Sequence, residues 1–173
     1  MVEQDTEKYI YEHKKRVRKW LISFAAELIA RSESHDNSKL MEPELSGWKQ
    51  MDQEPRYKYG TKDYFKKLKK YKWLLELHWS NNKHHPEYWE MHPDDKSRDL
   101  VDILEMLADW SSYKDKMSYT EASEMVEKQS ERYHLSDELK DLLLNTLSNY
   151  FVYFGGTSPS NNEPTSGHTD ILI

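Results

Sequence analysis

The chain has 173 residues, with 25 Lys and Arg against 31 Asp and Glu and a net charge of −6. This length predicts one domain with a single core. Because the net charge is negative, the overall electrostatic field does not attract nucleic acid or an anionic membrane, and bulk nucleic-acid binding is not expected. No cysteine is present, which excludes disulfides, thiolate ligands and a cysteine nucleophile. Any metal must therefore be held by nitrogen and oxygen.

The N-terminal segment MVEQDTEKYIYEHKK lacks the apolar core of a signal peptide. No stretch approaches the ~18 apolar residues of a membrane span. We therefore expect a soluble, cytoplasmic protein with no membrane partner, and a homo-oligomer stays open.

Helical periodicity dominates the chain, and no segment alternates as a sheet strand does. A first helix is predicted from about Thr6 to Arg31. Its apolar residues recur at steps of three and four on a face expected to point inward, formed by Ile10, His13, Val17, Trp20, Leu21, Phe24 and Leu28. The next stretch predicts a short helix around His35 to Leu40, a second helix starting near Pro43, and a loop over residues 57–60.

The rest of the chain predicts four more helices. Thr61 is expected to cap a helix that runs to about His78, with one face formed by Tyr64, Leu68, Tyr71, Leu75 and His78. SNNKHHPEYWEMHPDD is predicted as mainly loop, before a helix over residues 96–114. Capping residues at Ser118 and Ser136 predict the last two helices, and Gly155-Gly156 ends the second. We expect an all-α domain over residues 1–156 and a mobile tail over 157–173.

The dipeptide His35-Asp36, followed by Lys39, is the first candidate site. Adjacent helical residues point about 100° apart, so a metal that touches both must lie near a helix end. Lys39, one turn later, would share that pocket. Alone, the dipeptide also fits a helix-capping Asp beside an ordinary His.

Further histidines extend this pattern. His78, His84 and His85 stand within eight positions, and neutral imidazoles in a polar loop can bind a second metal or a substrate phosphate. Incidental surface histidines would give the same pattern. His13 can come to the same centre, although a histidine on an amphipathic helix is more often a core residue.

Carboxylates follow on the helix DLVDILEMLADWSSY. Asp102, Glu105 and Asp109 are spaced three and four apart, beside an expected apolar face of Leu100, Ile103, Leu104, Leu107 and Trp110. Stacked carboxylates repel each other unless a cation or a histidine lies between them, which favours a metal site over plain solvation.

A dense basic run, KDYFKKLKKYK, contains Lys66, Lys67, Lys69, Lys70 and Lys72. A solvated helix face is favoured here over a phosphate or nucleic-acid patch.

The motifs HDNSK, HHPE and LADW together resemble the HD-domain superfamily of metal-dependent phosphohydrolases. HDNSK is similar to its HD-x-x-K form and HHPE to its His-His-x-Glu segment. Within the superfamily, the set HDNSK, NNKHHPEYW and EMLADW most resembles a group of small bacterial and phage HD-like proteins. The similarity covers roughly residues 9–115.

This resemblance implies an all-helical HD-domain-like bundle with a central divalent metal: Mn, Mg, Co, Zn or Fe. Its four-ligand pattern carries over to His13, His35, Asp36 and Asp109, with Asp102 as the alternative last ligand. Members with two metals use additional histidines, which here would come from His78, His84 and His85. The short spacing between His13 and His35, and the lack of Gly in HDNSK, depart from common members.

The implied reaction is hydrolysis of a nucleotide or another small phosphate ester by a metal-activated water. Lys39 would neutralise phosphate charge, His84 or His85 would act as general acid, and Glu105 would orient a ligand histidine or the water. Two alternatives remain: a non-catalytic HD-like module that binds a nucleotide or a protein, and a di-iron oxygenase of the same fold.

Overall fold

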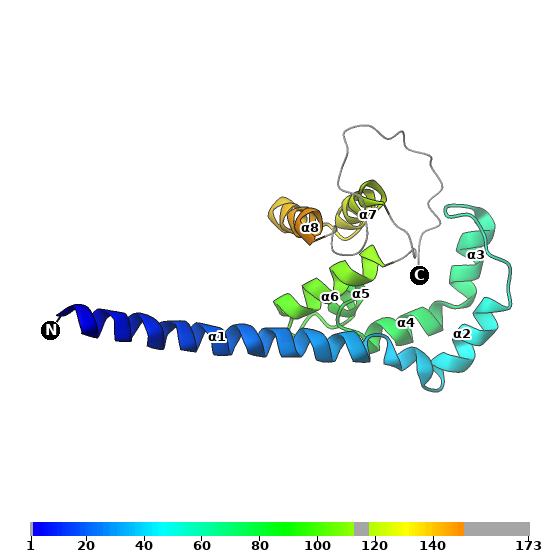
Figure 1. Cartoon of the computed structure of the whole chain (residues 1–173). Coiled ribbons are helices and arrows are strands. Elements are labelled where there is room, and N and C mark those ends of the chain that lie inside the picture. Colours follow the sequence, from blue (N-terminus) through cyan, green and yellow to red (C-terminus); the bar gives the residue numbers. More distant parts are fainter. Residues whose placement is uncertain (1, 113–117, 151–173) are drawn as a thin grey trace. The chain divides into compact units, whose positions relative to one another are not determined.

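The computed structural model describes residues 2–112 and 118–150 (Figure 1). Within these ranges the secondary structure is helical and no strand occurs, which confirms the all-α prediction. The chain divides into two units, Met1–His35 and Asp36–Ile173. The tail predicted over 157–173 and the helix stop at Gly155-Gly156 lie outside the described residues. The helix predicted to end near residue 114 ends at Ser111. The single domain predicted over 1–156 stays a prediction.

The first unit is one helix, α1 (Val2–Ser34), which extends past both predicted ends. The predicted inward stripe has no core to point into within this unit. Trp20 is 67% exposed and Phe24 is 54% exposed, and their rings stack with centroids 6.0 Å apart. Although α1 has 33 residues, neither it nor any other helix in the described ranges combines the length and apolar character that crossing a bilayer requires.

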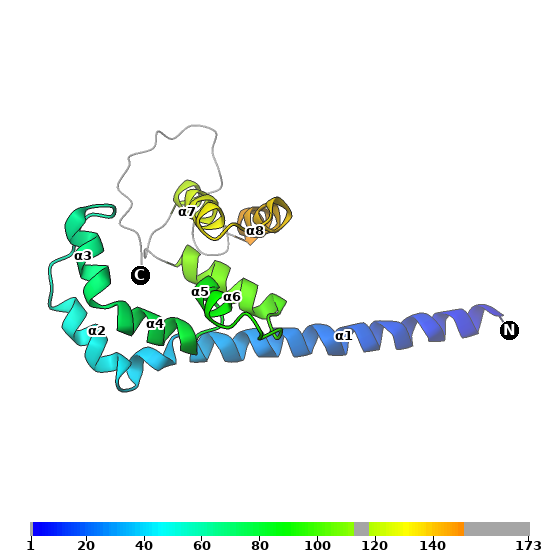
Figure 2. The same ribbon diagram turned by 180° about the vertical axis from the view of Figure 1, so that it is seen from behind.

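The second unit begins with three α-helices and a 3-10 helix that contact one another (Figure 2). The elements are η1 (Asn37–Leu40), α2 (Glu44–Asp52), α3 (Lys62–Lys70) and α4 (Lys72–Asn81). Met51, Tyr71 and Leu74 form the core, and Trp48 and Leu68 pack against it. The short helix and the helix after Pro43 were both predicted, and Thr61 caps α3 by accepting from the Tyr64 amide at 3.2 Å.

The single helix predicted from Thr61 to His78 is wrong, because the chain leaves the helix at Tyr71 (φ −102°, ψ 18°). The Tyr71 hydroxyl donates to Glu54 at 2.9 Å and its ring is buried, so packing and this bond hold the break in place. The predicted buried face is still correct at both ends, since Tyr64 and His78 are buried.

Gly47 lies where α2 meets α4, and Gly47→Ala is expected to destabilise the protein. A Cβ there would lie 2.7 Å from Leu74 Cδ1 and 2.9 Å from Trp73 Cη2. Overpacking costs about 1–3 kcal/mol, which exceeds the gain of up to about 1 kcal/mol from replacing glycine inside a helix. Urea unfolding measures the change, with Gln50→Ala on the same helix as the control. A more stable Gly47→Ala protein would show that the contact relaxes at no cost.

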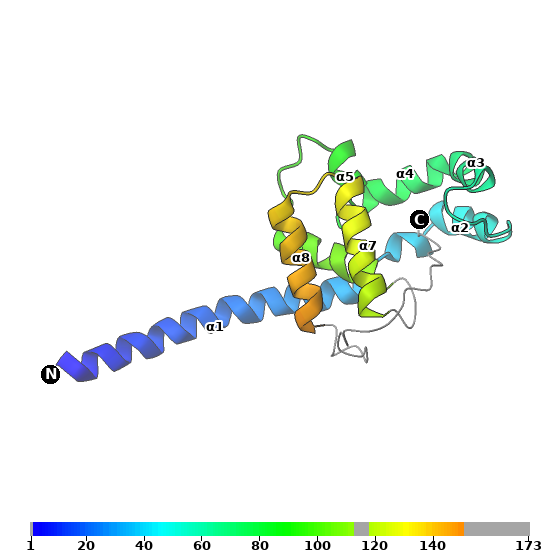
Figure 3. The same cartoon turned by 90° about the horizontal axis from the view of Figure 1, so that it is seen from above.

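After α5 (Pro86–Met91), which contacts α4, a second core joins the last three helices of the unit. These are α6 (Leu100–Ser111), α7 (Tyr119–Arg132) and α8 (Asp137–Tyr150). Helices α7 and α8 lie side by side (Figure 3). The buried residues of this core are Met106, Leu107, Trp110, Ala122, Met125, Val126, Leu143 and Leu147. The capping box predicted at Ser118 and Glu121 is confirmed.

Two predictions about this region need correction. The stretch predicted as mainly loop contains α5, which Pro86 can start because the first helical position needs no backbone N–H donor. Helix α6 begins at Leu100, capped by Asp99, and not near residue 96. Its buried face includes Met106, whereas Leu100 and Leu104 are 71% and 38% exposed.

Candidate metal centre

Five described elements or turns of the second unit bring histidines and carboxylates together. His78 lies near the end of α4, and His84 and His85 lie in the turn between α4 and α5. Asp36 precedes η1, Glu44 starts α2, and α6 carries Glu105 and Asp109. Two groups place their ligand-type atoms within 4.8 Å of one another: Asp36, His78 and His85, and His84, His85 and Asp109.

Asp36 has a left-handed backbone, with φ 56° and ψ 17°. Asp and Asn tolerate this region better than other residues with a side chain. The conformation turns the chain directly after the end of α1 and before η1. Asp36 is therefore the N-cap residue of η1, and the sequence predicted that a metal touching both His35 and Asp36 would lie near a helix end.

His78 is held by a buried carboxylate. Its Nδ1 lies 3.0 Å from Glu44 Oε2, and both residues are at most 2% exposed. Glu44 also accepts from Asn81 Nδ2 at 2.9 Å and from Ser38 Oγ at 3.0 Å. A proton on Nδ1 that is donated to Glu44 leaves the lone pair on Nε2, which is the arrangement found for metal-ligating histidines.

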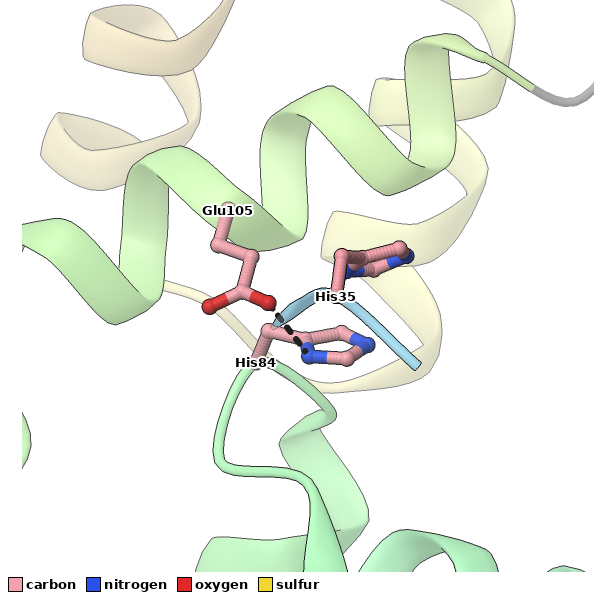
Figure 4. A group of neighbouring side chains, drawn as sticks. All are labelled: His35, His84 and Glu105. Atoms are coloured by element: carbon pink, nitrogen blue, oxygen red, sulfur yellow. Dashed lines mark ion pairs between the residues drawn. The ribbon is translucent and has the colours of Figure 1, made fainter. Parts of the chain in front are cut away.

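His84 has a similar arrangement, in which Nδ1 also faces a carboxylate. Its Nδ1 lies 3.2 Å from Glu105 Oε1, and its side chain is buried (Figure 4). Figure 4 also draws His35, the residue before Asp36. Donation of the Nδ1 proton to Glu105 leaves the His84 Nε2 lone pair for another partner.

The Nε2 atoms converge on Asp36. Its Oδ1 lies 3.3 Å from His78 Nε2 and 3.6 Å from His84 Nε2, and His85 Nε2 lies 2.9 Å from His78 Nε2. Two ligands about 2.1 Å from a shared ion are about 3.0 Å apart at a right angle and about 3.4 Å apart at a tetrahedral angle. The donor set therefore fits a divalent ion, and its mixture of imidazole and carboxylate suits Mn, Fe, Co or Zn.

Charge balance supports Asp36 as an anion. In the metal-free protein, burial raises the pKa of Asp36, but the neighbouring His78 ring and Lys39 ammonium outweigh that effect and hold the pKa well below its usual value. Lys39 Nζ lies 2.7 Å from Asp36 Oδ2 and 5.1 Å from the centroid of the Trp48 ring. For Glu44, burial likewise raises the pKa, and donation from Asn81, His78 and Ser38 lowers it below its usual value.

Acid is expected to destabilise the metal-free protein through His85. Burial, with His84 and His78 next to it, lowers the pKa of His85 from 6.5 to about 3. The unfolded chain therefore binds a proton between these values that the folded chain does not. The contribution to stability is complete above pH 6.5 and is lost as the pH falls through this window. One such group gives a slope of at most about 1.4 kcal/mol per pH unit.

Urea unfolding in the presence of a chelator at pH 7 and pH 5 measures this slope. His85→Gln should flatten it, and His92→Gln serves as the control outside the cluster. The assignment to His85 is wrong if His85→Gln retains the wild-type slope.

The predicted ligand His13 is not brought to His35. Both belong to the first unit, where α1 runs without a break between them. Their 22-residue separation corresponds to about 33 Å along the helix. Asp102 also has another role, because it accepts from the Asp99 amide at 3.0 Å in the capping box of α6. Asp109, and not Asp102, belongs to the groups around His84 and His85.

Glu44 is the functional candidate that the sequence analysis missed. An acidic residue after Pro43 in the first turn of a helix is what the helix dipole alone favours, so its sequence position carries no separate signal. Asn81 was interpreted as part of a polar loop, but its side chain donates to Glu44. Only the packing of α2 against α4 brings these residues together.

An all-helical protein with histidines oriented by carboxylates is a candidate metalloprotein. The chain matches, over residues 2–149, a family described as "Family of unknown function (DUF5662)". It belongs to this family. No curated protein and no solved structure matches the chain.

Proposed function

We propose that this protein is a metal-dependent phosphohydrolase of the cytoplasm, with an HD-domain-like bundle, that hydrolyses a nucleotide or another small phosphate ester. The observation that carries the proposal is the pair of oriented histidines. His78 and His84 each face a carboxylate through Nδ1 and lie within 3.6 Å of Asp36 Oδ1 through Nε2. Two imidazole nitrogens and a carboxylate oxygen then face one another, and a divalent cation would stabilise that arrangement.

Asp36, His78 and His85 would hold one ion, and His84, His85 and Asp109 offer ligands for a second. His35 is proposed as a further ligand because the peptide bond to Asp36 keeps it at the same helix end. His13 is left out of this set. The resemblance to HD-domain proteins, carried by HDNSK and HHPE, shares Asp36, Asp109 and the additional histidines with this set, but its first ligand, His13, is not part of it.

The bound ion would lower the pKa of a water molecule and polarise a phosphoryl oxygen. The oxygen of water would then bond to phosphorus as the ester P–O bond breaks, and the leaving oxygen would take the proton that the water gives up. Lys39, whose ammonium already lies next to Asp36, would balance the negative charge of the phosphate. Glu105 and Glu44 would fix the rings of His84 and His78 through Nδ1.

His85 does not suit the role of general acid that the sequence suggested for it. Its pKa of about 3 makes it neutral at neutral pH, so it has no acidic proton of the kind an imidazolium donates. A neutral imidazole is, in contrast, the form that binds a metal. We therefore assign His85 to metal binding.

The test is phosphate release from a panel of nucleotides and phosphate esters, measured with Mn, Co, Mg, Zn or Fe after removal of metal by a chelator. We expect turnover that needs added metal and stops on chelation. Lack of affinity for any of these ions would refute both enzyme readings and leave a non-catalytic binding module. Bound iron with oxygen uptake and no phosphate release would establish the oxygenase in place of the hydrolase.

A further inference from the structure

A basic surface with exposed aromatic rings covers the loop before α3 and the outer face of α3 itself. Residues 56–72 contain eight Lys and Arg and one acidic residue, Asp63. The remainder of the chain has 17 basic and 30 acidic residues. The net charge of −6 is therefore the sum of +7 in residues 56–72 and −13 in the rest of the chain.

Most of this charge is available for a partner. Lys70 pairs with Glu54, and Lys72 pairs with Glu76 at 3.1 Å. Five cations are exposed and have no ion-pair partner within residues 2–112 and 118–150: Arg56, Lys58, Lys62, Lys66 and Lys69. We call these five residues, with Tyr59 and Phe65, the basic surface.

Helix α3, which Figure 1 locates in the chain, carries lysines and one exposed ring. Lys62, Lys66 and Lys69 follow the helical steps of four and three, so they form one stripe opposite the buried Tyr64. Phe65 lies beside this stripe, three residues after Lys62 and four before Lys69, and is 55% exposed. Like charges at these steps destabilise a helix, and a polyanion would remove that repulsion.

The rings are held in fixed positions. Tyr64 is 9% exposed, and its ring contacts those of Tyr59 and Phe65 with centroids 5.2 and 5.4 Å away. Tyr59 is 43% exposed. The loop that carries Tyr59 is closed by Thr61, whose hydroxyl donates to the Lys58 carbonyl at 2.7 Å. Two exposed rings thus contact the same buried ring, in a segment rich in cations.

We propose that the basic surface binds single-stranded nucleic acid, with Phe65 and Tyr59 stacking on unpaired bases and the lysines contacting phosphates. Lysines with interleaved exposed rings are what sequence-tolerant single-strand binding requires. A helix that lies in a membrane interface needs a broad apolar face, and the outer face of α3 offers Phe65 alone. The acidic remainder of the chain confines a strand to this segment. This surface is independent of the metal centre and its proposed reaction.

The experiment is fluorescence anisotropy of the full chain with labelled single-stranded oligonucleotides, from 25 to 200 mM salt. Contact of the five cations with phosphates predicts a slope of log affinity against log salt of about −3.5, at about 0.7 per phosphate for a single strand. Replacing Lys62, Lys66 and Lys69 by Gln should reduce the slope by about 2. The control carries the same change at Lys96, Lys128 and Lys140, which lie outside the basic surface.

Phe65→Ala tests stacking separately from charge. We expect affinity to fall at least about fivefold, with an unchanged salt slope, and Phe65→Tyr to retain wild-type affinity because the ring is kept. Circular dichroism checks that each variant is folded. Equal effects of the two lysine triples, or tighter binding to duplex than to single strands, would overturn the proposal. So would binding to phosphatidylserine vesicles without binding to oligonucleotides.

Discussion

Asp36→Asn is expected to weaken metal binding at least about 100-fold and to remove metal-dependent phosphate release. Loss of a residue that only orients a ligand typically costs 10–100-fold in metal affinity, so loss of a direct ligand sets a larger expectation. Asp36 Oδ1 is the atom on which His78 Nε2 and His84 Nε2 converge. Isothermal titration calorimetry with Mn and Zn, together with metal content after dialysis, measures the loss.

Asn is the appropriate replacement because it tolerates the left-handed backbone that Asp36 adopts. The shape and the turn are then kept while the negative charge is removed. Asp94→Asn, an exposed acid outside the cluster, is the matched control and should bind metal as the wild type does. Wild-type metal affinity in a folded Asp36→Asn protein would show that the metal centre lies elsewhere.

The sequence predicted helices well where local signals define them. The cap at Thr61 and the box at Ser118 confirm this, because capping depends on residues three positions apart. The break at Tyr71 was not predictable in the same way. It depends on a bond to Glu54, 17 residues earlier, and the alternative of a continuous helix satisfies the same periodicity. The periodicity of apolar residues predicts whether a segment is a helix or a strand better than it predicts where that element ends.

The residues of the candidate site likewise separate into those that local motifs predict and those that depend on distant contacts. Asp36 and His84 lie close together, as the sequence suggested. They could be predicted because the motifs HDNSK and HHPE contain them. His13 was assigned by order along the chain, and order alone takes no account of the length of the helix that separates it from His35. Glu44 carries no motif, and its role comes from its contact with a residue 34 positions later.

Glu44→Gln is expected to weaken metal binding about 10–100-fold and to lower the free energy of unfolding by about 2–3 kcal/mol. The Glu44 carboxylate accepts from His78, Asn81 and Ser38 while it is only 2% exposed. An amide has one acceptor oxygen and one donor group, so at least one of these donors meets another donor. The proton on His78 Nδ1 also loses its anionic partner, and Nε2 is then no longer fixed as the metal-facing lone pair.

Metal titration and urea unfolding of the same preparation separate the two effects. Glu90→Gln, an exposed acid on α5, is the control and should change neither. If Glu44 only stabilises the packing of α2 on α4, Glu44→Gln will unfold at lower urea but will bind metal as the wild type does under native conditions. A positioning role requires both changes. His78→Ala added to Glu44→Gln should then weaken metal binding less than it does in the wild type, because the two residues act through one ring nitrogen.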